Sequence, residues 1–95
     1  MKKYTDSEVE QHLTSLPGWV YEDGFISKKF VFKDFSEAFA FIARVALIQE
    51  QLNHHANWSG VYNKVTLKLQ THDAGGITEK DITLAGKVGK MMNDE

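Results

Sequence analysis

One long amphipathic segment, from about Asp34 to Leu52, constrains the fold of this chain more than any other feature. Its apolar side chains recur every three or four residues, which marks a single buried face on an α-helix. Asp34 and Glu37 place acidic charge at its start, where the positive end of the helix dipole favours it. The segment predicts a helix whose inner face contains Phe35, Ala38, Ile42, Val45, Ile48 and Leu52.

Two β-hairpins are predicted, one on each side of this helix. Before it, Asp23-Gly24 separates two β-rich runs, and this dipeptide favours the tight turn of a hairpin. After it, polar residues alternate with apolar ones, which is the period of a strand with one buried face, here containing Val65, Leu67 and Leu69. Asn63-Lys64 is the predicted turn of the second hairpin.

A short helix is predicted near the start of the chain and a further helix near its end. Thr5 followed by Glu8 forms a capping-box pattern, and Pro17-Gly18 marks the end of the first helical region. Near the other end, Thr78 is a suitable N-cap, and Asp81 stands three positions later. The element order is therefore α-β-β-α-β-β-α.

This order predicts one α+β domain over residues 1–95. Its architecture is a two-layer sandwich, with a four-stranded antiparallel sheet and three helices on one face. Such a sheet has a second face without helices and has edge strands that can pair with another chain. We therefore expect a homodimer or a homotetramer.

Composition excludes several classes of function. The net charge is −2, which does not favour direct binding to nucleic acid or to a membrane surface. The chain has no cysteine, so disulfides and thiolate metal sites are excluded. No apolar run approaches the ~20 residues of a membrane span, and the first residues lack the apolar core of a signal peptide. We expect a cytoplasmic protein.

Three of the four histidines are candidates for chemistry: His54, His55 and His72. The adjacent pair lies at the end of the long helix, and neighbouring residues there point in different directions, so the two rings could act as acid and base around one ligand. His72 follows the last strand and can approach them if the strands are neighbours. The alternative is a set of surface histidines. A metal site is not favoured, because the adjacent pair lacks the usual ligand spacing.

Other residues have both a functional and a structural interpretation. Glu50 lies one turn before His54 and could orient its ring, or it could be an exposed helix carboxylate. Asp81 could belong to the site, or it could simply complete the cap of the last helix. Trp58 is interpreted as a core residue or as a pocket wall against which a flat ligand could lie.

Together these residues resemble the pterin-4a-carbinolamine dehydratase family, whose vertebrate member is also a dimerization cofactor of a homeodomain transcription factor. The family pattern is a polar residue, a His pair, an aromatic residue, a histidine and an aspartate, matched here by Glu50, His54-His55, Tyr62, His72 and Asp81. The resemblance covers nearly the whole chain. One departure is Ala56, where the family usually has Pro, Cys or Ser; alanine permits the same backbone path, so Ala56→Pro is expected to be tolerated.

The resemblance implies a hydro-lyase that dehydrates 4a-hydroxytetrahydropterin to quinonoid dihydropterin by histidine acid–base catalysis. No cofactor and no metal would be needed. It also implies a role in tetrahydrobiopterin-type cofactor recycling, with an aromatic amino acid hydroxylase as a pathway partner. His54, His55 and His72 would be catalytic, and the residues bordering the pterin would be Asn53, Gln70, Thr71, Asp73 and, nearby, Asp81.

A non-enzymatic role is the alternative interpretation of the same chain. The family's coactivator role uses the helical surface and assembly rather than the pocket, and a catalytically silent relative could serve as an assembly factor. Such a relative should have lost one or more of the three histidines, and this chain retains them all.

Overall fold

The computed structural model describes residues 1–93 and contains four strands and four helical segments. In chain order these are α1 (Asp6–Leu13), β1 (Val20–Glu22), β2 (Phe25–Val31), α2 (Phe35–Leu52), β3 (Asn57–Val61), β4 (Lys64–Leu69), the short 3₁₀ helix η1 (His72–Ala74) and α3 (Glu79–Asn93). All strand pairs are antiparallel, in the order β1-β2-β4-β3. The predicted α+β architecture is confirmed.

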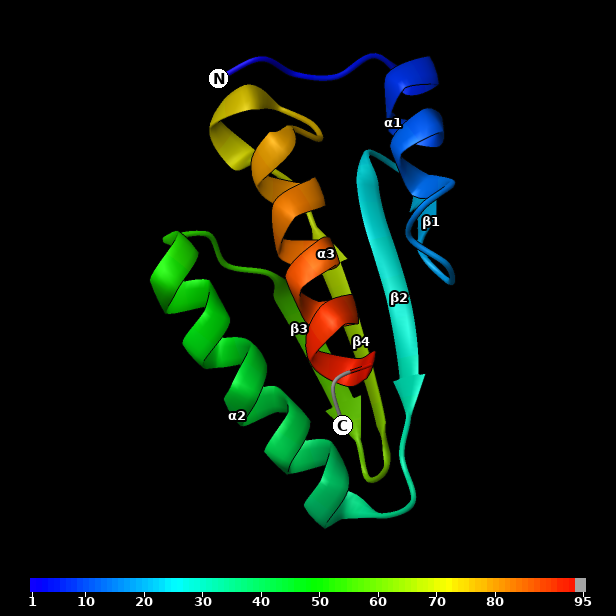
Figure 1. Ribbon diagram of the computed structural model, residues 1–95, viewed down its shortest axis with the longest axis vertical. Helices are drawn as coiled ribbons and strands as arrows, with labels where there is room; N and C mark the ends of the chain where they lie inside the picture. Colours follow the sequence, from blue (N-terminus) through cyan, green and yellow to red (C-terminus); the bar gives the residue numbers. More distant parts are fainter. Residues whose placement is uncertain (94–95) are drawn as a thin grey trace.

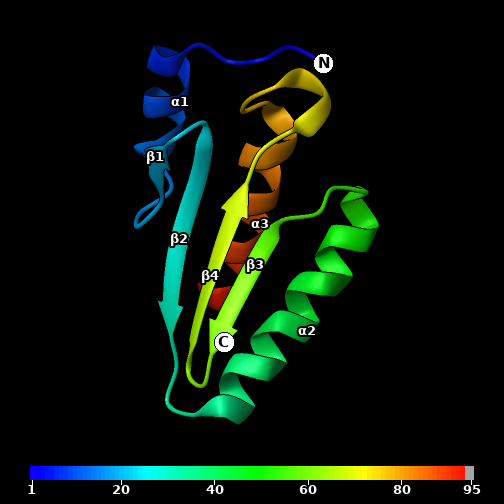
Figure 2. The same cartoon turned by 180° about the vertical axis from the view of Figure 1, so that it is seen from behind.

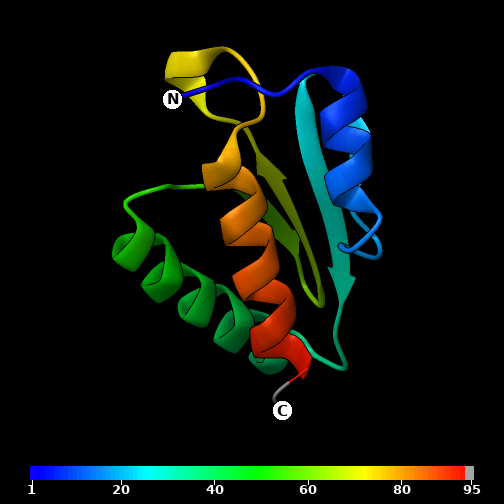
Figure 3. The ribbon, with the colours of Figure 1, turned by 45° about the horizontal axis from the view of Figure 1, so that its top comes forward.

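The helices cover one face of the sheet. Helix α3 crosses the middle of the sheet, and α2 lies next to α3, on the β3 side (Figure 1). Seen from behind, the other face has no helix in front of it (Figure 2). Helix α1 lies near the β1 edge on the helical side, so the three helices fan out over one face (Figure 3). Among residues 1–93, no helix is long and apolar enough to cross a membrane.

The core lies between the sheet and helices α2 and α3. Strand residues alternate so that one face of β2 and β4 is buried, and the buried strand residues are Ile26, Phe30, Val65, Leu67 and Leu69. The helices contribute Ala38, Phe41, Val45, Leu84, Ala85 and Val88. The prediction that Phe35 faces inward is wrong: it is 57% exposed, because it opens α2 and packs on the exposed Phe39 ring instead.

Two local predictions about turns had different outcomes. Asp23 and Gly24 both have positive φ angles, of 55° and 80°, and join β1 to β2 as predicted. The turn of the second hairpin is Tyr62-Asn63, one residue earlier than predicted, because Lys64 already pairs with Val61. Tyr62 has a φ of 54°, and the Asn63 side chain anchors the turn by donating to the Phe32 carbonyl at 2.8 Å.

Candidate active site

The end of helix α2 determines where the histidine pair points. Asn53 caps the helix in the left-handed conformation, with φ 50° and ψ 44°. Asparagine tolerates this conformation better than most residues. The chain changes direction at this residue, and His54 is buried whereas His55 is exposed. The two rings therefore have different partners, although they are adjacent in sequence.

His54 is held by a buried aspartate from helix α3. Its Nε2 lies 2.6 Å from Oδ1 of Asp81, which is fully buried. The other oxygen, Oδ2, accepts from the Thr71 hydroxyl at 2.8 Å and from the Thr78 backbone N–H at 2.9 Å. A carboxyl group that accepts on both oxygens is best satisfied as a carboxylate, so Nε2 of His54 carries the hydrogen and donates it. This contact fixes both the tautomer and the orientation of the ring.

His55 turns back to Glu50 on the last turns of α2. Its Nε2 lies 3.1 Å from the Glu50 carboxylate, and both side chains are largely exposed. The prediction that Glu50 could orient His54 is therefore wrong, because the turn at Asn53 directs His54 towards Asp81 instead. An exposed polar contact of this kind contributes little to stability, so its effect is on the direction of the His55 ring.

His55 and His72 line one cavity of about 300 Å³, together with Phe25, Asn57, Lys68 and Gln70. The cavity lies on the sheet face that has no helix. Leu67 and Leu69 face the core, and side chains alternate along the chain here, so Lys68 and Gln70 face the opposite side of the sheet. Its size is at the lower end of the range for small-molecule sites, about 300–1,000 Å³. The structure thus brings together two of the three candidate histidines.

The remaining walls of this cavity are held by contacts across the sheet. The Gln70 amide donates to the Gly24 carbonyl at 2.9 Å, which ties β4 to the first hairpin turn. The Lys68 ammonium lies 4.7 Å from the centroid of the Phe25 ring. Two imidazoles beside an amide and an ammonium can exchange protons with a small polar ring and bind its oxygen and nitrogen atoms. Phe25, Asn57 and Lys68 were not predicted as site residues.

The other candidates do not line this cavity. Asn53 and Asp73 are exposed, and Thr71 is buried in the Asp81 network. Full burial gives Asp81 a supporting position behind His54 rather than a contact with a ligand. Trp58 is 53% exposed on the edge strand β3, so its prediction as a core residue is wrong, and it does not line this cavity. Within residues 1–93, no three histidine, aspartate or glutamate side chains are grouped to hold a metal.

Gln49 is a supporting residue that the sequence interpretation missed. It is buried on the inner face of α2, and its side-chain oxygen accepts from the Ala56 backbone N–H at 2.6 Å. This contact closes the loop that carries both histidines. The available signal was a polar residue between Val45 and Leu52, on the face of the helix that points to the core. Proline at position 56 would have no N–H to donate.

Comparisons with known proteins identify the family of this chain. The family model described as pterin 4 alpha carbinolamine dehydratase matches residues 2–91. A protein from Prochlorococcus marinus (strain MIT 9215), provisionally named a pterin-4-alpha-carbinolamine dehydratase, is 48% identical over 88 residues, covering 93% of this chain and 92% of its own. A protein of the same provisional name from Rhodopseudomonas palustris (strain BisB18) is 52% identical over 87 residues, covering 90% and 86%.

A solved structure is similar throughout. The crystal structure of a transcriptional coactivator/pterin dehydratase from Brucella melitensis has a TM-score of 0.91 and 42% identity, covering 95% of this chain and 98% of its own. Sequence and fold thus point to the same family, over nearly the whole length of these proteins. The chain belongs to the pterin 4 alpha carbinolamine dehydratase family, which is a family of hydro-lyases.

Proposed function

We propose that this protein dehydrates a 4a-hydroxytetrahydropterin to quinonoid dihydropterin, in the recycling of a tetrahydrobiopterin-type cofactor. The observation that carries the proposal is the cavity that His55 and His72 share, on the uncovered face of the sheet. The names of the relatives support the same substrate class. The amide of Gln70 and the ammonium of Lys68 supply polar groups to hold a pterin ring in that cavity.

The reaction requires two proton transfers and no change of oxidation state. The C4a–O bond breaks, and its oxygen leaves as water after receiving a proton. N5 loses its proton, and the electron pair of the N5–H bond forms the C4a=N5 double bond. One imidazole of the site donates the first proton and another accepts the second, and solvent then restores both rings to their starting forms. An imidazole suits both roles, because its ordinary pKa of about 6.5 lets both forms coexist near neutral pH.

His54 is the third histidine of the proposed site. Its Nε2 is committed to Asp81, so a proton exchanged with the pterin would pass through Nδ1, which bonds to no residue in the described part of the chain. The buried carboxylate of Asp81 would stabilise the imidazolium form of His54 during such an exchange. His54 is thereby available as acid or base, alongside the two histidines that line the cavity.

A role as a coactivator is the second candidate function. The Brucella melitensis structure is described as a transcriptional coactivator/pterin dehydratase. In this chain, α2 exposes large apolar side chains that a partner protein could cover: Phe35, Phe39 and Leu47. This surface lies on the helical layer, away from the cavity, so the two functions could coexist in one protein.

The test is a dehydration assay with enzymatically generated 4a-hydroxytetrahydropterin. The purified protein should accelerate the decay of its absorbance well above the uncatalysed rate. His72→Ala should lower this acceleration and raise KM. His12→Ala should do neither, because His12 lies on α1, where its ring stacks on that of Tyr4, and does not line the cavity. Treatment with EDTA should leave the rate unchanged. Absence of acceleration by a folded wild-type protein would leave the coactivator role as the better account.

A further inference from the structure

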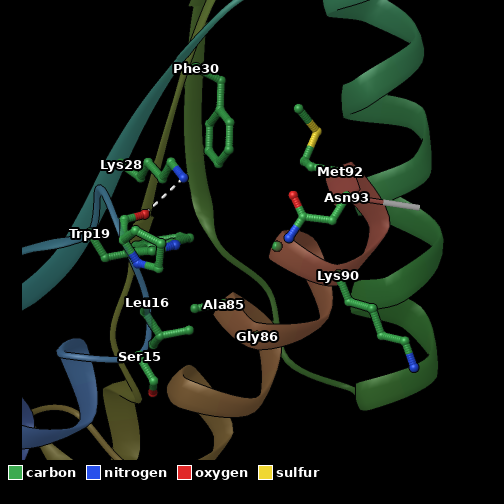
Figure 4. Close-up of a pocket in the computed structure, with 12 residues that line it drawn as sticks. Ser15, Leu16, Trp19, Lys28, Phe30, Ala85, Gly86, Lys90, Met92 and Asn93 are labelled. Carbon is green, nitrogen blue, oxygen red and sulfur yellow. Dashed lines mark hydrogen bonds between the residues drawn. The ribbon is translucent and has the colours of Figure 1, made fainter. Parts of the chain in front are cut away.

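A second cavity, of about 440 Å³, lies on the opposite face of the sheet from the cavity that His55 and His72 line. It is bounded by the loop before β1, by β2 and by α3 (Figure 4). Its volume falls within the range of small-molecule sites, about 300–1,000 Å³. None of its lining residues lines the histidine cavity. The proposed dehydration therefore does not account for it.

The hollow results from three unusual residues at inward-facing positions. Lys28 lies on the inner face of β2, between the buried side chains of Ile26 and Phe30. Opposite it, α3 has Gly86 and Gly89, and a Cβ atom added to either would meet nothing within 4 Å. A glycine inside a helix is less favourable than alanine, because it has more backbone freedom to lose on folding. The absent side chains leave open space where a core would ordinarily be filled.

Lys28 places a fixed positive charge at the wall of this cavity. Its ammonium donates to the Pro17 carbonyl at 2.9 Å and lies 5.0 Å from the centroid of the Phe30 ring. Its stem passes over Gly18, where a Cβ atom would lie only 2.8 Å from the Lys28 Cε. No acidic side chain of residues 1–93 pairs with it, and none lines the cavity. A half-buried lysine whose ammonium has no carboxylate partner has N–H groups available for an anion.

The rest of the cavity is largely aromatic and apolar. Trp19 and Phe30 are both nearly buried and meet edge to face at 6.3 Å between ring centroids. The side chain of Asn93 points towards the same space, whereas the Lys90 ammonium points away from it (Figure 4). One fixed cation and one amide suit a monoanion better than a phosphate, for which arginine forks are the preferred partners.

We propose that this cavity binds a small organic monoanion with an aromatic or apolar body. The carboxylate would accept from the Lys28 ammonium and from the Asn93 amide. The body would pack on Trp19 and Phe30, in the space left by the two glycines. This is a second ligand site, separated from the histidine cavity by the sheet.

Trp19 provides a local reporter for the test. The chain has two tryptophans, so Trp58→Phe leaves Trp19 as the sole tryptophan fluorophore. This variant is titrated with 3-phenylpropionate and, as a neutral control of the same shape, with 3-phenylpropionamide. Trp19 fluorescence should change saturably with the carboxylate, and the amide should bind at least about tenfold more weakly, because it lacks the charge-assisted bond to Lys28.

Matched variants locate the binding. In the Trp58→Phe background, Lys28→Met keeps the stem and removes the charge, so affinity for the carboxylate should fall at least about tenfold. Lys29→Met removes the neighbouring exposed lysine and should not change affinity. Gly89→Leu fills the cavity and should abolish binding while the helix gains propensity. His72→Ala, in the other cavity, should leave binding unchanged.

Three results would overturn the proposal. The first is an unchanged Trp19 signal up to about 10 mM 3-phenylpropionate, because a Kd weaker than this corresponds to less than ~3 kcal/mol of binding free energy. The second is equal affinity for the carboxylate and the amide. The third is unchanged affinity in Gly89→Leu, whose fold is checked by circular dichroism. This third result can overturn the proposal even if Lys28→Met fails to fold.

Discussion

Nε2 of His54 and Oδ1 of Asp81 lie 2.6 Å apart although 27 residues separate them in the sequence. The contact joins the end of α2 to the first turn of α3, and both partners are buried. Asp81 also holds Thr71, the residue before His72, through its second oxygen. One carboxylate therefore positions one candidate histidine directly and the loop that carries another.

We predict that Asp81→Asn lowers the rate of pterin dehydration by about 10- to 100-fold while the protein stays folded. An asparagine amide can still accept from Thr78, but its NH₂ group would face Nε2 of His54 and favour the wrong tautomer. The measurement is kcat beside that of Glu79→Gln, an exposed change in the same helical turn. Equal rates for Asp81→Asn and wild type would remove Asp81 from the site.

Ala56→Pro is predicted to destabilise the protein, contrary to the expectation from the family pattern. The substitution removes the N–H that donates to Gln49 at 2.6 Å and leaves a buried amide oxygen without its partner. The expected loss is about 1–3 kcal/mol in the free energy of unfolding, measured by urea denaturation. In a Gln49→Met background the same proline should cost less, because no buried acceptor is then left unpaired. An equal cost in both backgrounds would contradict this explanation.

Self-association is predicted from two exposed apolar surfaces. All five residues of the edge strand β3 are exposed, including Val61 at 77%, and Phe39 on α2 is 60% exposed. An unpaired edge and an uncovered apolar face favour a symmetric oligomer. Light scattering should give a molar mass that is a multiple of the 10.8 kDa chain mass. Phe39→Lys or Val61→Lys should lower this molar mass. Ser36→Lys adds the same charge at an exposed polar position and should leave the molar mass unchanged. A wild-type monomer at micromolar concentration would contradict the prediction.

The capping box of α1 should contribute a pH-dependent part of stability. The Thr5 backbone N–H, donating at 2.8 Å, lowers the pKa of Glu8 below its ordinary value of 4.5. Because the pKa is lowered on folding, the contribution is present above the unfolded pKa and is lost as pH falls through the folded one. The Tm difference between wild type and Glu8→Gln should therefore narrow between about pH 6 and pH 3. A Tm difference that widens as the pH falls would contradict the predicted direction of this pH dependence.

Features determined by neighbouring residues could be predicted from the sequence. The capping box needs only Thr5 and Glu8, and both of its reciprocal bonds are present. The Asp23-Gly24 turn depends on two residues that tolerate positive φ angles. Such signals act within a few residues, so they do not depend on how the rest of the chain packs.

Features that depend on distant contacts could not be predicted in this way. Glu50 pairs with His55 rather than with His54 because one left-handed residue, Asn53, redirects the chain. Trp58 is exposed because it lies on β3, an edge strand that the helices do not bury. The strand order in the sheet determines that β3 is at the edge. The family pattern indicated which histidines to consider, but only the packed sheet shows that two of them share a cavity and the third lies beside Asp81.

The most direct test of the proposed function is the rate of pterin dehydration by His54→Ala and His55→Ala beside wild type, measured above the uncatalysed background. If the histidines act as acid and base, each change should lower kcat by about 10²- to 10⁴-fold, with the circular dichroism spectrum unchanged. The double variant should lose less than the product of the two single losses, because the residues act as a unit. Near wild-type rates in both single variants would contradict the assignment of this site.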